Sequence, residues 1–403
     1  MIKLNFDQVA IKKSEIIWLI ATLFVFAVIS VCLFSNYLYS ANAQKTLYPS
    51  DFLGHLNFIK TIHSGKIFTI PHPGFHILVI LFSWLSFTSM EVSMIIVLVF
   101  CVLSSFVITY FYLRSKFLFD HLESLLVSWI LFLLGAIFVP FFSKTMYLGQ
   151  GTPNIWHNPT FIAQKPLAIL IFFVGIVFLQ FNHKSLLDKK SLFLAFLLFA
   201  SVWIKPNFAI TFILSLFIYI FLSRQSRFKI NRYGQALMVA IPSIISLALQ
   251  YYFTYKPLAG QYRTSLIIDY LAVWKHYSPN PYISLLLGIA FPVVLIIFKF
   301  STIKKNPLFA LAVIFLVIAL VQMAFFAEAG YRFFYWNFSW SYDMGLFFVF
   351  LVALIAYFSW MKSINKNKLL DIAKFLLCSL FLLLHLASGI IYLAKILSGF
   401  PYD

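Results

Sequence analysis

Long runs of hydrophobic residues follow one another along the chain from Ile16 to Leu397, separated by short polar segments. Several runs exceed about 18 residues, the length at which an apolar segment predicts a transmembrane helix. Backbone groups in lipid are satisfied only inside helices or closed barrels, and these runs are too long and too uniformly apolar for barrel strands. The pattern therefore predicts an all-α polytopic membrane protein.

The run 74–88 decides how often the chain crosses the membrane. It is about fifteen residues long, which is typical of interfacial or re-entrant segments. If it does not cross, the basic loops all lie on the side of the basic N-terminus, as the positive-inside rule requires; if it crosses, several of them lie outside. We therefore expect about eleven transmembrane helices. The predicted spans are 16–38, 91–113, 122–142, 161–181, 191–204, 207–222, 234–253, 281–298, 308–326, 343–360 and 372–397.

The polar segments on the other side form the predicted external face. They are the segment 39–90, with juxtamembrane helices, the loops 143–160, 254–280 and 327–342, and a turn at 205–206. Proline disfavours helix at the residue before it, so Lys205-Pro206 predicts a tight hairpin. A single kinked helix is the alternative, but it would bury Lys205 at mid-membrane. No internal repeat divides the chain, so we expect residues 1–403 to form one integral-membrane domain.

Composition and charge narrow the class of protein. Hydrophobic residues make up 62% of the chain, and its formal net charge is +18. Cytoplasmic anchoring charges account for most of this excess, so we expect a multi-pass protein of the plasma (cytoplasmic) membrane, surrounded by lipid and without a nucleic-acid partner. The N-terminal run reads as a retained helix. Cys32, Cys101 and Cys378 all lie in apolar runs and form no Cys-x-x-Cys pair, which indicates neither a disulfide framework nor a cysteine metal site.

Histidines accompany the first acidic residue of the external face. Asp51 and His55 are four residues apart and share a face if the segment is helical, so the pair suits a reacting hydroxyl, a diphosphate or a metal ion. A helix cap followed by a surface histidine is the ordinary alternative. His72 lies between two prolines, with His76 four residues later, and a turn with histidines at headgroup depth would explain that motif equally well. One aspartate and one histidine are too few for a metal site.

Two Lys-Pro pairs stand at outer ends of predicted helices. His157-Asn158-Pro159 is a turn signal before the run at 161, and Lys165 follows one turn further in. Lys205-Pro206 repeats the pair. Each lysine alone is explained by a side chain whose ammonium reaches the interface. Together, beside His157 and Asn158, they favour a phosphate-binding patch, because an ammonium and the free amides of helix N-termini both attract phosphate.

The segment 328–343 combines aromatic residues with isolated polar ones. Aromatic belts at the membrane interface explain some of its tryptophans and tyrosines. They do not require the interleaved charged and amide groups, whereas carbohydrate sites commonly join aromatic faces to a few polar side chains. An arginine also suits bidentate binding of a phosphate. The residues concerned are Glu328, Tyr331, Arg332, Asn337 and Trp340.

Over residues 16–115 this arrangement resembles the GT-C superfamily of membrane glycosyltransferases, which includes protein mannosyltransferases and aminoarabinose transferases. Asp51 matches the catalytic or acceptor-orienting carboxylate that the family places in its first external loop. His72-Pro73 is similar to the His-Pro segment of the mannosyltransferases. The chain departs from the family in the loop 143–160, where His157 stands and several members carry a second acid.

The resemblance implies a glycosyltransferase that moves a sugar from a polyprenyl-phosphate donor to a glycan, lipid or protein of the cell envelope, with an extracytoplasmic active site. Asp51 and His55 would then be catalytic. Binding of the donor phosphate would fall to Lys165, Lys205 and Arg332. The sugar or acceptor would be held by His72, His157, Asn158, Glu328, Tyr331, Asn337 and Trp340. No cofactor is required, although His55 and His157 leave a divalent cation open.

Two other functions stay open. The first is a flippase or transporter of a lipid-linked saccharide, which predicts functional charges at mid-membrane. The predicted spans offer only Gln250, Gln322 and His385 there, and this scarcity argues against ion coupling. The second is a polymerase or ligase of surface polysaccharide, for which the loop 254–280 is small.

Overall fold

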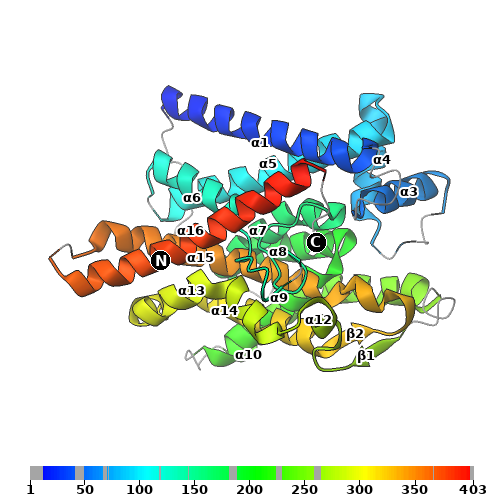
Figure 1. Ribbon diagram of the computed structural model, residues 1–403. Coiled ribbons are helices and arrows are strands. Elements are labelled where there is room, and N and C mark those ends of the chain that lie inside the picture. Colours follow the sequence, from blue (N-terminus) through cyan, green and yellow to red (C-terminus); the bar gives the residue numbers. More distant parts are fainter. Residues whose placement is uncertain are drawn as a thin grey trace. The chain divides into compact units, whose positions relative to one another are not determined.

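The computed structural model describes residues 12–40, 50–66, 70, 72–117, 119–143, 145–180, 188–223, 229–257, 265–365 and 367–399. Within these ranges the regular secondary structure is helical apart from one two-stranded sheet, as Figure 1 shows. It divides into two compact units, which we call the first unit (Met1–Ser124 and Ile155–Ser265) and the second unit (Leu125–Asn154 and Leu266–Asp403). The single-domain assignment stays a prediction.

Among the described residues, eight helices are long and apolar enough to cross a membrane. Their length and hydropathy confirm that the chain is a polytopic helical membrane protein. Gly74–Ser86, His121–Leu133 and Pro206–Leu222 are shorter apolar helices. The eight candidates are Lys13–Tyr39, Met90–Lys116, Pro159–Gln180, Asn231–Tyr255, Pro281–Ile303, Pro307–Phe325, Arg332–Ser363 and Leu369–Leu397.

The first unit packs its helices around α5 and α8. Helix α5 contacts α1, α4 and α7, and α8 contacts α7, α9 and α10, while α3 lies against α4. The π-helix η4 (Tyr251–Tyr255) continues α10. The helices are α1 (Lys13–Tyr39), α3 (Phe52–His63), α4 (Gly74–Ser86), α5 (Met90–Lys116), α7 (Pro159–Gln180), α8 (Lys189–Ile204), α9 (Pro206–Leu222) and α10 (Lys229–Gln250).

The second unit is built around α15, which is buried along almost its whole length. It packs against α13 and α14, and α16 lies against α13. A short antiparallel ladder joins β1 to β2, with Leu266 opposite Glu328. The elements are β1 (Leu266–Ile268), α12 (Ala272–Tyr277), α13 (Pro281–Ile303), α14 (Pro307–Phe325), β2 (Phe326–Glu328), the 3-10 helices η5 (Gly330–Tyr335) and η6 (Asn337–Ser339), α15 (Trp340–Ser363) and α16 (Leu369–Leu397).

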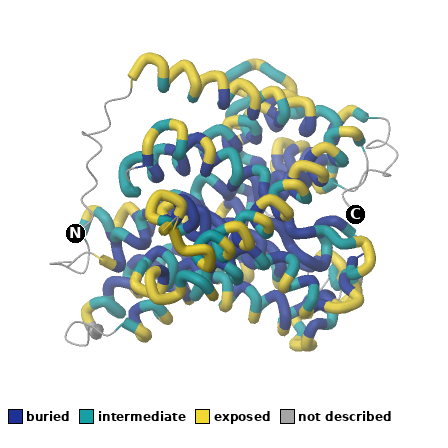
Figure 2. Tube along the Cα trace, turned by 60° about the vertical axis from the view of Figure 1, so that its left-hand side comes forward, coloured by how far each residue is buried: buried dark blue, intermediate teal, exposed yellow. Residues whose placement is uncertain are grey.

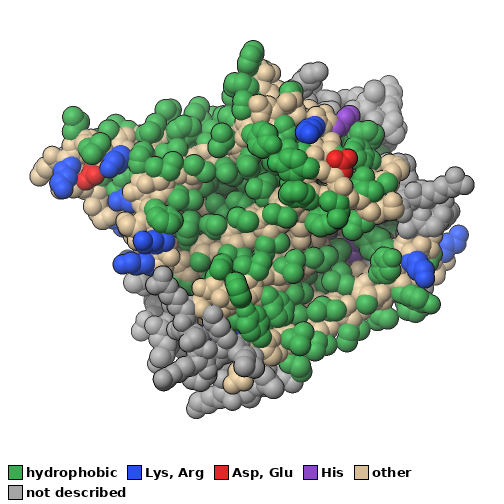
Figure 3. Space-filling view, turned by 90° about the horizontal axis from the view of Figure 1, so that it is seen from below, with side chains coloured by type: hydrophobic (Ala, Val, Ile, Leu, Met, Phe, Trp, Pro, Cys, Tyr) green, Lys and Arg blue, Asp and Glu red, His purple; other side chains and the backbone are tan. Residues whose placement is uncertain are grey.

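Large hydrophobic side chains are exposed along several helices, as expected of surfaces that face lipid. Helix α1 exposes Ile17, Trp18 and Phe24 by 64–68%, and Figure 2 shows the exposed positions along the trace. In the face drawn in Figure 3, hydrophobic side chains predominate and the charged ones lie toward its margins. A soluble monomer rarely exposes so continuous an apolar surface.

The predicted span 122–142 is wrong as a continuous helix. Helix α6 (His121–Leu133) ends at Leu133, and the next residues form neither helix nor strand. Their backbone groups are bonded to other segments: Gly135 N–H donates to the carbonyl of His385 (3.1 Å), and Ile137 N–H to that of Leu287 (3.1 Å). Non-helical backbone at membrane depth is tolerated where protein satisfies it. An ideal Cβ on Gly135 would lie 2.8 Å from the Cα of Gly389, so this approach needs a glycine.

Other predictions about the chain can be compared with the structure directly. The expected helices of the segment 39–90 are present as α3 and α4, and their juxtamembrane position stays a prediction. The break at Lys205 is also confirmed, because α8 ends at Ile204 and α9 begins at Pro206. Residues 41–49, 67–69 and 71 of the external segment, residue 144 of the loop 143–160 and residues 258–264 of the loop 254–280 lie outside the described ranges. Four basic residues of the predicted cytoplasmic loops also lie outside them, namely Lys184, Arg224, Arg227 and Lys366.

Candidate functional site

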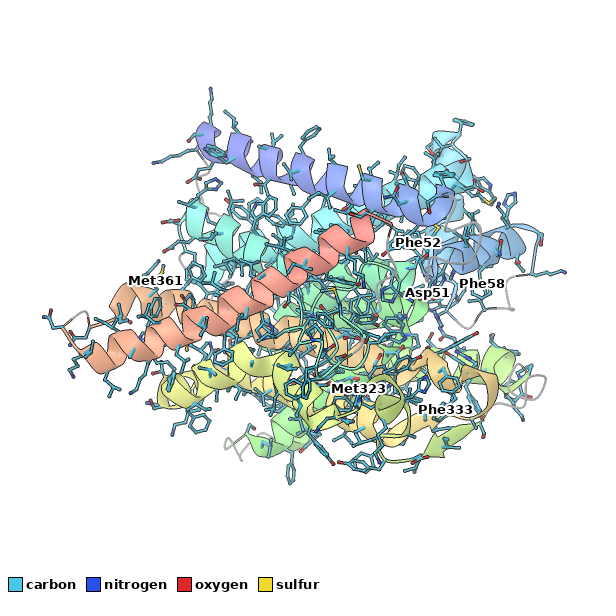
Figure 4. The ribbon with its side chains drawn as sticks, in the orientation of Figure 1. Asp51, Phe52, Phe58, Met323, Phe333 and Met361 are labelled. Carbon is cyan, nitrogen blue, oxygen red and sulfur yellow. The ribbon has the colours of Figure 1, made fainter. Side chains whose placement is uncertain are left out.

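Asp51 stands at the N-terminus of α3 and is exposed (Figure 4). The next residue, Phe52, is fully buried and stacks on Tyr37 of α1, with ring centroids 4.8 Å apart. This contact fixes where α3 begins. Asp51 occupies the N-cap position, but its side chain forms no capping hydrogen bond. Its carboxylate instead accepts a hydrogen bond from the Nδ2 of Asn158 (2.5 Å). The side chain of Asp51 therefore does not cap α3, although the residue stands at the cap position.

Asn158 connects the acid to the rest of the site. It is buried, and its Oδ1 accepts hydrogen bonds from the backbone N–H of Phe161 (2.8 Å) and from Thr160 Oγ1 (2.9 Å). The bond from Phe161 makes Asn158 the cap of α7, with Pro159 in the first helical position that proline favours. The amide of Asn158 thus caps the N-terminus of α7 and also binds the Asp51 carboxylate.

Lys205 approaches the same amide from the break between α8 and α9. Its side chain is buried (5% exposed), and its Nζ donates to Asn158 Oδ1 (3.2 Å) and to Thr160 Oγ1 (3.1 Å). The backbone carbonyl of Lys205 accepts from Gln164 Nε2, which also donates to Ser201 Oγ (2.9 Å). These contacts hold the extended residue in place. A lysine whose ammonium simply reaches the membrane interface does not explain them.

Two histidines lie directly against each other beside this cluster. His55 Nδ1 and His76 Nε2 are 2.9 Å apart, joining α3 to the first turn of α4. Burial lowers the pKa of His55 well below its usual range, and the electrostatic effects of His76, Lys205 and His72 add to this shift. Burial lowers the pKa of His76 to about 4, against an opposing effect of the Pro73 backbone. Both imidazoles are therefore neutral near pH 7.

His157 precedes the capping asparagine and is buried. Its carbonyl accepts the backbone N–H of Asp51 (3.2 Å), so the loop before α7 binds both the backbone and the side chain of this acid. Burial lowers the pKa of His157 to about 4; Asp51 opposes this shift, and Lys205 adds to it. His157 is thus a neutral group next to the acid at pH 7.

The cluster lies where the N-termini of four helices meet. Asp51 occupies the N-cap position of α3, Asn158 caps α7 and Lys205 precedes α9, while His76 lies in the first turn of α4. Hydrogen bonds join Asp51, Asn158 and Lys205, and the contact between His76 and His55 adds the end of α4 to that of α3. Helix N-termini carry partial positive charge and free N–H groups, which favour bound anions. With the ammonium of Lys205, this arrangement provides the electrostatics of a phosphate site.

The predicted site residues of the second unit form a separate chain of contacts. Arg332 Nε lies 3.5 Å from Glu328 Oε2, and the same oxygen accepts from Asn337 Nδ2. Trp340 Nε1 donates to Asn337 Oδ1 (3.4 Å). Tyr331 lies in η5 between them in sequence. The four contacting side chains hold β2, η5 and η6 together, so each has a structural role whatever it binds.

The remaining site predictions divide into those the structure joins and those it leaves apart. Asp51, His55, Asn158 and Lys205 belong to one cluster in the first unit, and His72 acts electrostatically on His55. Lys165 is buried in α7. The site predictions lacked His76 and Thr160, although the sequence analysis had noted the four-residue spacing of His76 from His72. Among the described residues, no three histidine, cysteine or acidic side chains are grouped so as to hold a metal ion.

Comparison with known proteins adds no relative to this geometry. No protein-family model matches the chain, and no curated protein matches it with significant similarity. The site therefore has to be interpreted from its own residues.

Proposed function

We propose that the chain is a GT-C-type membrane glycosyltransferase, which transfers a sugar from a polyprenyl-phosphate donor to a glycan, lipid or protein of the cell envelope. One observation carries the proposal. The exposed carboxylate of Asp51 and the buried ammonium of Lys205 are bonded to the same amide, that of Asn158, where four helix N-termini meet. A carboxylate that can take the proton of an acceptor hydroxyl thus lies next to an ammonium that can bind the donor phosphate.

The proposed chemistry is a displacement at the anomeric carbon of the donor sugar. The acceptor oxygen bonds to that carbon while the bond from the carbon to the phosphate oxygen breaks, and polyprenyl phosphate leaves with the electron pair. Asp51 orients the acceptor hydroxyl and takes its proton. Lys205 and the helix N-termini stabilise the charge that develops on the leaving phosphate. Since that group departs as a stable anion, the proposal requires no metal.

Further ligands are proposed on the basis of residue chemistry. Lys165, buried one turn inside α7, is proposed as a second phosphate ligand, and Arg332 as a third. Glu328, Asn337 and Trp340 offer the acceptors, donors and aromatic face that bind sugar hydroxyls and rings. Because Glu328 pairs with Arg332, a phosphate at Arg332 would compete with this carboxylate.

The sidedness of the proposal follows from the charges of the loops. We propose eleven crossings, with α8 and α9 as a short hairpin and α4 lying at the outer surface. Basic loops such as those at Arg114 and Lys304 then face the cytoplasm. Under this topology Asp51, His157 and the break at Lys205 all face the extracytoplasmic side, where polyprenyl-phosphate donors would be used.

Purified protein in proteoliposomes, supplied with a polyprenyl-phosphate sugar and a membrane extract as acceptor, tests the proposal. Asp51→Asn should lower turnover by about 100-fold or more, because it removes the proton acceptor while keeping an isosteric group. Lys205→Gln should raise the donor KM. Lys60→Gln is the matched control: Lys60 is an exposed lysine of α3, paired with Glu91 at 2.8 Å, and its loss should leave transfer unchanged.

The outcomes separate the candidate functions. Near-normal turnover by Asp51→Asn would remove the catalytic role of that carboxylate. Movement of intact donor across the bilayer, without release of polyprenyl phosphate, would identify a flippase. Products of increasing chain length would identify a polymerase.

A further inference from the structure

Lysines of the second unit gather where the end of α13 meets the end of α15 and the start of α16. Residues 299–306 and 361–374 hold a single acid, Asp371. Figure 3 shows lysine and arginine side chains at the left margin of its face, the side on which Figure 1 draws the turn between α15 and α16. The described lysines of these two segments are Lys299, Lys304, Lys305, Lys362, Lys368 and Lys374.

Lys299 is held against an aromatic ring at the end of α13. Its backbone leaves helical geometry (φ −125°, ψ 16°) shortly before the helix ends at Ile303. Its ammonium lies 4.2 Å from the ring centroid of Trp360 on α15, which is within the range of a cation–π contact. A lysine that only anchors a helix end extends its ammonium into water, whereas the side chain of Lys299 is partly buried.

A second ammonium is held close to the same helix end. Lys374 of α16 places its Nζ 6.0 Å from the ring centroid of Phe298, the residue before Lys299. Phe375, the next residue of α16, meets Trp360 edge-on, with ring centroids 5.5 Å apart. Aromatic contacts thus join the ends of α13, α15 and α16 and hold one lysine of α13 and one of α16 beside them.

The positive charge of this pair of lysines is not balanced by the protein. Lys299 interacts electrostatically with Asp371, which attracts it, and with Lys374, which repels it. In the part of the chain that the structure describes, neither lysine lies within 4.0 Å of a carboxylate. Two neighbouring ammonium groups favour an anion that can accept hydrogen bonds from both, and a phosphate has the oxygens to do so.

Exposed hydrophobic side chains lie next to these lysines on the same helices. They include Ile297 and Phe300 on α13, and Leu376 and Leu377 on α16. A free anion would use only the lysines, whereas a phospholipid would use both features, with its phosphate at the ammonium groups and its acyl chains along the hydrophobic side chains. Basic pockets between transmembrane helices are places where anionic headgroups bind.

We infer that the ends of α13, α15 and α16 form a binding site for an anionic phospholipid, whose phosphate is bound by Lys299 and Lys374. Under the proposed topology, the basic loops at Lys304 and Lys362 place this lipid in the cytoplasmic leaflet. The inference goes beyond the proposed glycosyltransferase and does not depend on it, because it rests on contacts within the second unit alone.

Native mass spectrometry of the full chain in neutral detergent, with added phosphatidylglycerol or phosphatidylcholine, tests the site. The wild type should retain phosphatidylglycerol in preference to phosphatidylcholine. Lys299→Gln and Lys374→Gln should each weaken phosphatidylglycerol binding by about fivefold, and the double variant by about 25-fold, which corresponds to about 1 kcal/mol per lysine. The matched control is Lys60→Gln combined with Lys275→Gln, which removes the same two charges at exposed positions of α3 and α12 and should bind as the wild type does.

Equal retention of the two lipids by the wild type would overturn the inference, and so would unchanged phosphatidylglycerol binding by the double variant or an equal loss in the control. Lys299→Arg combined with Lys374→Arg keeps both charges and should bind as tightly as the wild type. If this variant also lost the lipid, the lysines would act through the fold and the inference would be wrong. Excess inorganic phosphate should not displace the lipid; displacement would identify a site for a free anion and contradict a phospholipid site.

Discussion

At the scale of single residues, Asn158 is the connection on which the site depends. Its Nδ2 binds the carboxylate of Asp51, and its Oδ1 accepts from Lys205, Thr160 and Phe161. An aspartate here would place two carboxylates in contact, and a smaller residue would break every bond at once. An amide is the side chain that donates to an acid on one side and accepts from an ammonium on the other.

Asn158→Ala should therefore reduce both stability and activity. Loss of the cap of α7 should cost about 1–2 kcal/mol, and turnover should fall further because Asp51 loses its partner. Asn306→Ala is a matched control: Asn306 caps α14 through the N–H of Leu308 (3.0 Å) and takes no part in the cluster. Thermal unfolding in detergent and transfer assays on both variants make the comparison. Equal loss of activity in the two would show that Asn158 acts only through stability.

At the scale of elements, close packing of α4 against α8 brings the histidine pair to the cluster. Gly74 begins α4, and an ideal Cβ at this position would lie 2.8 Å from the carbonyl oxygen of Trp203 near the end of α8. A backbone atom cannot move aside as a flexible side chain can. The glycine in the His-Pro segment is therefore needed for this approach, and it determines how far His76 lies from α3.

Gly74→Ala should destabilise the protein by about 1–3 kcal/mol through overpacking and should lower activity by displacing α4. Gly54→Ala is the control. Gly54 lies within α3 with no atom within 4 Å of its ideal Cβ, so alanine there should stabilise the helix by about 0.5–1 kcal/mol. Opposite shifts of the unfolding temperature are expected. A neutral Gly74→Ala would show that α4 and α8 can separate without cost.

At the scale of the whole molecule, charge decides orientation. Formal charges sum to +18, and the basic loops alternate with loops that carry the candidate site residues. Eight described helices are long enough to cross the bilayer, and α6, α8 and α9 are shorter. The number of crossings therefore depends on these short helices, and on the positive-inside rule we propose that all three cross.

Single cysteines introduced after replacing the three native ones test this topology. Asn57→Cys on α3 and Phe334→Cys on η5 should react with an impermeant maleimide added outside intact cells. Lys362→Cys should react only after permeabilisation. All three positions are exposed. Labelling of positions 57 and 334 from opposite sides would contradict a single extracytoplasmic face, whereas agreement would leave open whether Asp51 and Arg332 act on one substrate.

The amino-acid sequence by itself determined the membrane class, the long apolar helices, the presence of helices in the segment 39–90 and the helix break at Lys205, because hydrophobic length and proline act locally. It also singled out Asp51, His55, Asn158 and Lys205. Only the tertiary structure decided that Asp51, Asn158 and Lys205 share one hydrogen-bonded cluster, that His55 contacts His76 beside it, and that α6 stops at Leu133. Those outcomes depend on partners distant in sequence. The Asp51 carboxylate is bonded to the amide of Asn158, and the backbone N–H groups after α6 are bonded to distant carbonyls, only once the helices have packed.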